Sequence, residues 1–282
     1  MNIVQRSLKV LALVVIFGFF LAPFYWIIVM SFMTNQDILS YPPHFLFQPT
    51  LENYQSLISG QLHTSDGVVD VEYFGYFWHS LIISGGSVLL SLIVGVPAAY
   101  ALSRYTFKGK DSVAFSILSV TFAPPLLVIV PLSLLFHSLG LYDTYTGLIL
   151  VYQLITLPLI VWIVRSYFDE IPVELENAMR LDGYSWAQTF RRISLPLAGP
   201  GVAAASLLAF IYAWNNFIFA LILGSGNVEP VTVSALQFIT ESGIRYGNIA
   251  AAMIFSIVPT LILAISVQRY LVRGLSFGAI KG

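Results

Sequence analysis

The sequence predicts an all-α membrane protein with six transmembrane helices. Hydrophobic residues make up 57% of the 282 residues, charged residues only 10%, and the mean hydropathy is +0.83. An average soluble domain carries about 25% charged residues, so this chain has too few charges to cover a water-facing surface. Six apolar stretches are long enough to cross a hydrocarbon core, which takes about 20 helical residues. We therefore expect one transmembrane domain over residues 1–282.

The six stretches are separated by polar or turn-rich segments. We place them at residues 10–32, 77–104, 113–137, 145–167, 201–224 and 248–272. The first is too long for a signal-peptide core and lacks a small-residue cleavage site, so we expect it to remain as a span. Prolines interrupt four of the stretches, and they are Pro97, Pro124, Pro125, Pro131, Pro158 and Pro259. Since neighbouring helices must satisfy the carbonyl groups that a proline leaves free, we expect kinked helices packed in a bundle.

Basic residues predict the orientation of the spans. Two Lys or Arg residues precede the first span, three lie between the second and third, four between the fourth and fifth, and three follow the sixth. Of the 13 basic residues, only Arg245 falls on the other side. Because Lys and Arg collect in cytoplasmic segments, we expect both termini, the loop 168–200 and the tail 273–282 in the cytoplasm.

The outer segment, residues 33–76, is acidic and contains no Lys or Arg. Its residues 51–58 predict a short helix on the outer surface, after two proline-containing stretches that favour extended chain. A plain linker is the open alternative for this segment.

The loop 168–200 is the longest polar interval on the predicted inner side, and it begins with a short helix. Pro172 suits a first helical position, where its missing N–H is not needed. Glu174 and Glu176 lie in the first turn, where negative charge complements the helix dipole. Gly183 ends this helix, as glycine often does where the chain turns through positive φ.

A second short helix follows in the same loop. Ser185 and Gln188 are spaced as a capping box at its start, and Pro196 is expected to end it. The first helix has a small apolar face, at i, i+3, i+4 spacing, formed by Leu175, Ala178 and Met179. Its acidic first turn disfavours an anionic lipid surface, which attracts basic helices. We therefore expect the helix pair to bind a cytosolic protein.

The predicted spans carry no central charged residue, which disfavours an ion-coupled carrier. Their polar residues are mild, and amides beside aromatic rings suit a neutral polyhydroxylated solute. In the fifth span, the i, i+3, i+4, i+7 spacing places one group on a shared face: Tyr212, Asn215, Asn216 and Phe219. With Gln153 and Trp214, these are the candidate substrate-pathway residues. Hydrogen bonding between packed helices is the alternative role of the amides.

The sequence predicts no chemistry on this chain. Cysteine is absent, and the four histidines are scattered without metal-ligand spacing. The only Gly-Lys pair, Gly109-Lys110, lacks the pattern of a phosphate-binding loop. We therefore expect no catalytic, cofactor-binding or metal-binding residues, and a membrane enzyme is disfavoured.

The loop also resembles a known family. The run ELENAMRLDG at residues 174–183, followed by ISLP at 193–196, is similar to the "EAA" loop of binding-protein-dependent ABC importer permeases. More narrowly, the chain resembles the six-span carbohydrate permeases of the maltose-transporter type. The likeness extends nearly end to end, through WNNF at residues 214–217 to the tail at 268–282. It implies the type I ABC importer permease architecture, with a cytosolic coupling helix pair.

The resemblance implies partners, a location and contact residues. The expected partners are a second, homologous permease, two ATP-binding-cassette subunits that hold ATP and Mg, an extracytoplasmic binding protein and a carbohydrate, with no nucleic acid. The expected location is the inner membrane of a bacterium or archaeon. The resemblance assigns coupling to the ATPase to Glu174, Glu176, Asn177, Ala178, Met179, Asp182, Gly183, Leu195 and Pro196, and a tail contact to Lys281 and Gly282.

Three positions depart from the family pattern. The family's loop usually has Glu at the position of Asn177 and Ala at that of Met179, and an Asn often precedes Ser80 where this chain has His79. The resemblance implies that the loss of this glutamate removes one charge available to pair with an Arg on the ATPase. Two other functions stay open: a permease for another solute, such as glycerol phosphate or an amino acid, and a stand-alone carrier or channel.

Overall fold

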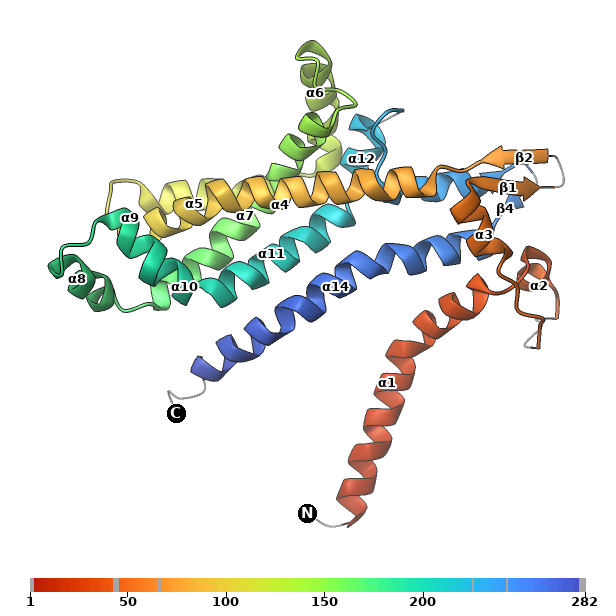
Figure 1. Cartoon of the computed structure of the whole chain (residues 1–282), viewed down its shortest axis with the longest axis horizontal. Coiled ribbons are helices and arrows are strands. Elements are labelled where there is room, and N and C mark those ends of the chain that lie inside the picture. The colour runs from red at the N-terminus through yellow and green to blue at the C-terminus, as the bar shows by residue number, and fades with distance from the viewer. Residues whose placement is uncertain (1–2, 43–45, 65–66, 225, 242, 279–282) are drawn as a thin grey trace. The chain divides into compact units, whose positions relative to one another are not determined.

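The computed structural model of the chain describes residues 3–42, 46–64, 67–224, 226–241 and 243–278 (Figure 1). The chain divides into two compact units. The first unit comprises residues 1–75 and 234–258, and the second comprises 76–233 and 259–282.

Four helices are long and apolar enough to cross a membrane. They are α1 (Ile3–Ser31), α4 (Tyr73–Arg104), α7 (Tyr145–Glu170) and α14 (Tyr246–Gly278). Two further pairs of helical segments pass the same test but are bent at a break. They are Lys110–Phe122 with Pro125–Ser138, bent by 95°, and Trp186–Leu197 with Gly199–Trp214, bent by 71°, so the described residues hold up to six spans. The four continuous helices coincide with the first, second, fourth and sixth predicted spans.

The third predicted span, residues 113–137, is not one helix. It consists of α5 (Lys110–Ser119), the short 3-10 helix η1 (Val120–Phe122) and α6 (Pro125–Ser138), with a bend of 95° at the break. Two consecutive prolines explain the bend, because a residue that precedes proline is pushed out of the α region. Ala123 and Pro124, which each precede a proline, have extended ψ angles of 121° and 123°.

The fifth predicted span, residues 201–224, is also interrupted. Helix α11 (Gly199–Trp214) ends before Asn215, and α12 (Ile218–Leu223) begins after the break. Both asparagine side chains bind nearby backbone, which competes with helix continuation. The Asn215 amide donates to the Ile211 carbonyl at 2.8 Å, and the Asn216 side-chain oxygen accepts from the N–H of Phe219 at 3.2 Å.

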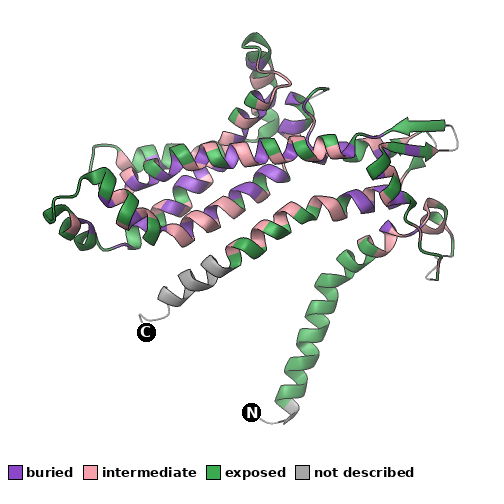
Figure 2. Cartoon of the chain, viewed as in Figure 1, coloured by how far each residue is buried: buried purple, intermediate pink, exposed green. Residues whose placement is uncertain are grey.

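The core of the second unit lies where α4, α6, α7, α11 and α12 meet, as the buried residues in Figure 2 show. Small residues allow this close packing. A Cβ added at Gly86 of α4 lies 2.7 Å from a methyl carbon of Ile149 on α7, and one at Gly201 of α11 overlaps the Tyr167 ring on α7. Helix α7 therefore contacts α4 on one side and α11 on another.

The first unit contains α2 (Asn35–Leu39), α3 (Glu52–Ser59) and two antiparallel hairpins. One hairpin pairs β1 (Gln61–Thr64) with β2 (Gly67–Asp70), with Leu62 opposite Val69, and the other pairs β3 (Ile239–Thr240) with β4 (Gly243–Ile244). Two short helices precede β3, namely α13 (Val231–Ser234) and η3 (Ala235–Phe238).

Helix α3 confirms the short helix expected at residues 51–58, and it rules out a structureless linker there. The buried Asn53 side chain fastens this helix to the end of α1 by donating to the carbonyls of Ser31 and Met33 at 3.0 and 2.9 Å. The β1–β2 hairpin was not predicted, because each strand has only four residues and no strict alternation of apolar and polar side chains.

Candidate functional site in the loop between α7 and α11

The loop 168–200 folds into short helices, as its capping and turn residues predict. They are α8 (Val173–Leu181), α9 (Trp186–Thr189), the π-helix η2 (Phe190–Ser194) and α10 (Leu195–Leu197). Both bonds of the predicted capping box are present between Ser185 and Gln188, at 3.3 and 2.8 Å. Gly183 follows α8 with a φ of +90°, a conformation that other residues adopt at a cost.

Two proline positions differ from the prediction. Pro172 is the residue before the first turn of α8 and not its first helical residue. Pro196 does not end the second helix, since α10 continues through it to Leu197. The reason is the π-turn before it: the Leu195 N–H bonds five residues back, to the Phe190 carbonyl. Pro196 thus lies in the first turn of α10, where no N–H is needed.

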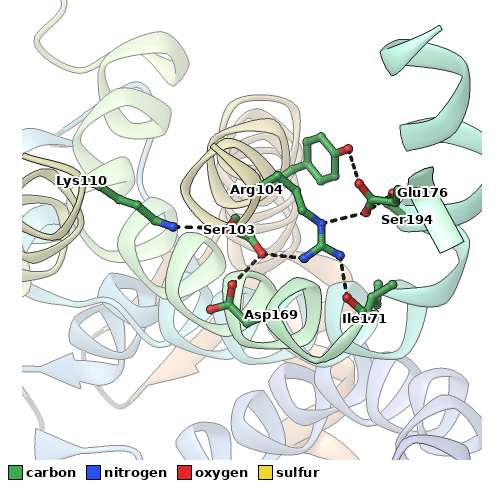
Figure 3. Close-up of polar contacts among 8 residues, drawn as sticks. Ser103, Arg104, Lys110, Asp169, Ile171, Glu176 and Ser194 are labelled. Carbon is green, nitrogen blue, oxygen red and sulfur yellow. Dashed lines mark hydrogen bonds and ion pairs between the residues drawn. The ribbon is translucent and has the colours of Figure 1, made fainter. Parts of the chain in front are cut away.

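The centre of the site is a buried carboxylate, that of Glu176 on α8, which is 1% exposed. One of its oxygens accepts from Arg104 Nε and from the Ser194 hydroxyl, both at 2.8 Å. The other accepts from the Tyr100 hydroxyl at 2.9 Å. The carboxylate therefore joins α4, α8 and η2 (Figure 3).

The Arg104 side chain extends this network toward α7. Its Nη2 donates to the carbonyl of Ile171, the residue that follows α7, at 2.9 Å, and its Nη1 donates to the Ser103 hydroxyl at 3.3 Å. Ser103 in turn donates to Asp169 at 2.6 Å. The side chains of Arg104 and Glu176 are only 6% and 2% exposed. A buried ion pair is tolerated when each partner is neutralised and hydrogen-bonded, as it is here.

Three aromatic rings cover the network from the apolar side. The Tyr100 ring lies 4.8 Å from Phe190 and 5.3 Å from Phe168, and these two phenylalanine rings lie 6.2 Å apart. Phe168 is fully buried. The ion pair itself is almost inaccessible to water, and in such low-dielectric surroundings its charge interaction is stronger than at a surface.

The residues of α8 around Glu176 point outward. We define the α8 surface as five of the exposed residues of this helix: Glu174, Leu175, Asn177, Ala178 and Leu181. Val173 and Arg180 of α8 are also exposed. Leu181 is 89% exposed and Leu175 46%. The predicted apolar face is thus mostly open, although Met179 is half-buried. Asp182 and Gly183 are exposed beyond the end of the helix.

The structure separates the predicted coupling residues into outward and inward sets. The resemblance groups Glu176 with the residues that meet a partner, yet its side chain is turned into the chain and is not accessible. Leu195 is half-buried and Pro196 exposed, both on α10. The predicted tail contacts, Lys281 and Gly282, lie outside the described residues.

The six pathway candidates do not form one face. Tyr212 is 57% exposed and Phe219 only 2%, because the helix breaks between them. The expectation that these two share a helical face with the asparagines is therefore wrong. Trp214 is buried, with its ring stacked on Phe210 at 5.5 Å and edge-on to Phe77 at 5.6 Å.

Gln153 is engaged between α4 and α7. Its amide donates to the carbonyls of Ser87 and Ile149 at 3.1 and 2.9 Å, and its oxygen accepts from the Ser91 hydroxyl at 2.5 Å. Ser91 also bonds Thr156 on α7 at 2.6 Å. These bonds fit the alternative interpretation of this residue, namely hydrogen bonding between packed helices.

Sequence reasoning missed three residues of the buried network. It used Arg104 only in the charge count, and it gave Tyr100 and Ser194 no site role. Their signal is weak, because the partners of Glu176 lie 72 and 76 residues upstream and 18 downstream. A charged residue at the end of an apolar span ordinarily faces water, so nothing in the sequence marked Arg104 as buried.

Long apolar helices, broken spans and a polar helix pair together define a multi-pass membrane transport subunit. The family model of the inner membrane component of binding-protein-dependent transport systems matches residues 87–277. The chain belongs to this family. It is a permease subunit of an ABC importer in the inner membrane, with no catalytic activity or cofactor of its own.

Individual relatives match almost the whole chain. The trehalose/maltose transport system permease protein MalG of Thermococcus litoralis is 32% identical over 284 residues, which cover 100% of this chain and 99% of that protein. The trehalose transport system permease protein SugB of Mycobacterium tuberculosis is 32% identical over 271 residues, 94% of each chain.

The fold also matches a solved transporter. A chain from the crystal structure of a bacterial ABC transporter involved in the import of the acidic polysaccharide alginate aligns with a TM-score of 0.71 at 23% identity, covering 96% of this chain and 98% of that one. The likeness supports the all-α permease architecture.

Proposed function

We propose that this chain forms half of the translocation pathway of an ATP-driven carbohydrate importer. The observation that carries this proposal is the similarity, over nearly its whole length, to two permeases named for trehalose or maltose transport. The complex would contain a second, homologous permease, two ATP-binding-cassette subunits and an extracytoplasmic binding protein. Hydrolysis of ATP belongs to the partner subunits.

We propose that the α8 surface docks into the ATPase. Its composition supports this role, because a largely exposed leucine, Leu181, stands on a short helix beside polar residues, and exposed apolar patches with a polar rim mark interaction sites. Glu174 supplies negative charge at the start of the helix. Asp182 and Gly183 form the turn that ends it. We assign Met179, Leu195 and Pro196 to the same docking, and Lys281 and Gly282 to a tail contact with the ATPase.

Asn177 offers a direct test of this docking. Replacing it by Glu places a carboxylate on the α8 surface without disturbing the buried network, since Asn177 is exposed. If the partner surface is basic, Asn177→Glu strengthens binding of the ATPase subunits to the detergent-purified permease, and added salt weakens this gain. Asp111→Asn, an exposed change outside the loop, is the control. Equal binding by all three chains at low salt would argue against docking through α8.

We further propose that the chain crosses the membrane six times, with both termini, the loop 168–200 and the tail 273–282 on the cytoplasmic side. The spans then fall near residues 10–32, 77–104, 113–137, 145–167, 201–224 and 248–272. The outer segment, 33–76, faces the binding protein. The charge distribution along the sequence supports this orientation.

The break between α11 and α12 is the part of the chain that we propose for the solute pathway. Irregular backbone at membrane depth is tolerated where it is buried in protein or lines a cavity. Asn215 is exposed at this break, and its amide suits hydroxyl groups of a sugar. Trp214 and Phe219, on either side of the break, are buried. Gln153 has a packing role, and Tyr212 faces outward from α11.

Transport by the reconstituted complex tests the substrate class. The permeases, ATPase subunits and binding protein are placed in lipid vesicles, and ATP hydrolysis and uptake are measured with trehalose, maltose, glycerol 3-phosphate and methionine. We expect a disaccharide to raise both rates. Stimulation by glycerol 3-phosphate or methionine alone would assign the chain to another solute. Uptake without ATP would contradict the importer and favour a stand-alone carrier or channel.

A further inference from the structure

The buried carboxylate of Glu176 has a second role that the docking surface does not explain. It is the point at which α4, α8 and η2 meet, through Arg104, Tyr100 and Ser194. The same guanidinium also holds the carbonyl of Ile171, where the chain passes from α7 to α8. One ion pair therefore fixes both the entrance to α8 and the helix itself.

We propose that Arg104 and Glu176 are positioning residues of the coupling step. Their pair locks α8 to the end of α4, so that a displacement of α8 is transmitted to that helix. The proposal rests on the proposed docking of α8 to the ATPase. It adds the path by which movement leaves the docking surface: through the ion pair into α4, in addition to the covalent connections of α8 to α7 and α9.

The short length of α8 makes such a lock necessary. The helix has nine residues, and isolated helices shorter than about 12–15 residues are marginal in water. Much of its surface is exposed, so apolar packing alone holds it weakly. Glu176 is its buried residue. The three directional bonds of this carboxylate set the orientation of the helix.

The bonding geometry suits transmission of force more than simple stabilisation. A buried ion pair contributes little net stability compared with a well-packed apolar pair, yet it fixes the relative positions of its partners. Arg104 donates Nε to Glu176 and Nη2 to Ile171, so its planar guanidinium allows one arrangement of the two chain segments. A pure packing role would be met equally well by two hydrophobic side chains.

Spin labels on the intact transporter test this proposal without a known solute. The chain contains no cysteine, so Val94→Cys on α4 and Val173→Cys on α8, both exposed, give one defined label pair in a complex with cysteine-free partners. The distance distribution between the labels is measured in lipid vesicles, without nucleotide and with a non-hydrolysable ATP analogue. We expect a narrow distribution that keeps its width and mean in both states, as for one rigid body.

Four variants of the labelled chain then separate positioning from stability. Glu176→Gln and the shorter Glu176→Asp should both broaden the distribution, because the bonds to α4 are lost or lengthened. The double variant Arg104→Met with Glu176→Leu leaves no buried charge unpaired, so it should insert and co-purify with the ATPase subunits, but its distribution should stay broad. Asp111→Asn, which removes an exposed charge that lies 3.6 Å from Arg165, is the matched control and should change nothing.

Coupling provides the second readout. The measured quantity is the factor by which the binding protein stimulates ATP hydrolysis in the assembled complex. In Glu176→Gln and in the double variant, this factor should fall by about tenfold, which is within the usual range of coupling between sites. An unchanged distribution in Glu176→Gln, or full recovery of width and coupling in the double variant, would overturn the proposal. Failure of the unaltered chain to bind the ATPase would instead refute the docking of α8, while the label distances still report on the lock.

Discussion

At the scale of residues, Glu176 and Asn177 show how one step along a helix separates two roles. Successive residues of an α-helix point about 100° apart. Glu176 is therefore buried against Arg104, while Asn177 is exposed on the α8 surface. The departure from the family pattern at Asn177 therefore changes the exposed surface of α8, which we propose as the docking surface, and leaves the internal attachment of α8 intact.

Replacing Glu176 alone should be more damaging than replacing both members of the pair. Glu176→Leu leaves the Arg104 guanidinium buried without its counter-charge, and breaking a buried pair in this way costs about 3–5 kcal/mol. Thermal unfolding of the detergent-purified chain measures the effect. The double variant Arg104→Met with Glu176→Leu should recover at least half of the lost stability. Equal losses in the single and double variants would show that the charge itself is not the cause.

At the scale of elements, turn residues and helix breaks position the α8 surface and the proposed solute pathway. Gly183 ends α8 at a φ of +90°, and its N–H donates to the Arg180 carbonyl at 3.0 Å. Arg180 itself lies over the Trp186 ring at 3.8 Å, which holds the turn between the two helices of the pair. The turn therefore sets how α8 is presented.

Gly183→Pro should abolish uptake while the chain still inserts into the membrane. Proline fixes φ near −65° and lacks the N–H, so the observed turn cannot form. Asp182→Arg should also abolish uptake, because it reverses a charge beside the α8 surface. Membrane fractionation and ATP-driven uptake in vesicles are the measurements. If either variant hydrolyses ATP at the unaltered rate in response to the binding protein and its solute, the turn has no coupling role.

The two asparagines at the break between α11 and α12 should respond differently. Asn216→Leu removes the acceptor for the Phe219 N–H, and loss of such a hydrogen bond costs about 1 kcal/mol. Asn215→Leu removes an exposed amide, so it should change the rate or selectivity of uptake at nearly constant stability. Paired unfolding and uptake assays separate the effects. Normal uptake kinetics in both variants would leave the asparagines with a structural role only.

At the scale of the whole molecule, the distribution of basic residues and the number of membrane helices together predict how the chain crosses the membrane. The four continuous helices and two bent pairs supply up to six crossings among the described residues. The basic residues collect at the loops that hold α8 and the end of α4. Docking of a soluble ATPase needs these loops on the cytoplasmic side.

Labelling of single introduced cysteines tests this orientation directly, since the chain has no cysteine of its own. We expect a membrane-impermeant maleimide to label Ser59→Cys in cells whose inner membrane is intact and accessible, and to label Val173→Cys only after the membrane is opened. Both positions are exposed in the structure. Labelling of Val173→Cys from outside would invert the proposed topology.

Local signals along the sequence determined much of this protein. Length and hydropathy determined the membrane class and four of the spans, and residue types with strong backbone preferences determined the loop, as at Ser185 with Gln188 and at Gly183. These features depend on neighbours within a few residues, so they can be predicted without the fold. The break at Pro124 was harder to predict, because proline also occurs inside the continuous helices α4, α7 and α14. The break after Trp214 has no proline at all, and it is marked only by two asparagines.

Only the tertiary structure decided which charges are buried and which are exposed. Glu174 and Glu176 look alike in sequence, yet one is exposed and the other is held by Arg104, 72 residues away. Likewise, the sequence allowed Gln153 to contact a solute, but in the structure its side chain is bonded to the Ser91 hydroxyl and the Ser87 carbonyl of α4. The physical reason is that burial and hydrogen-bond partners depend on segments far apart in the chain, while helix capping and span length depend on local sequence.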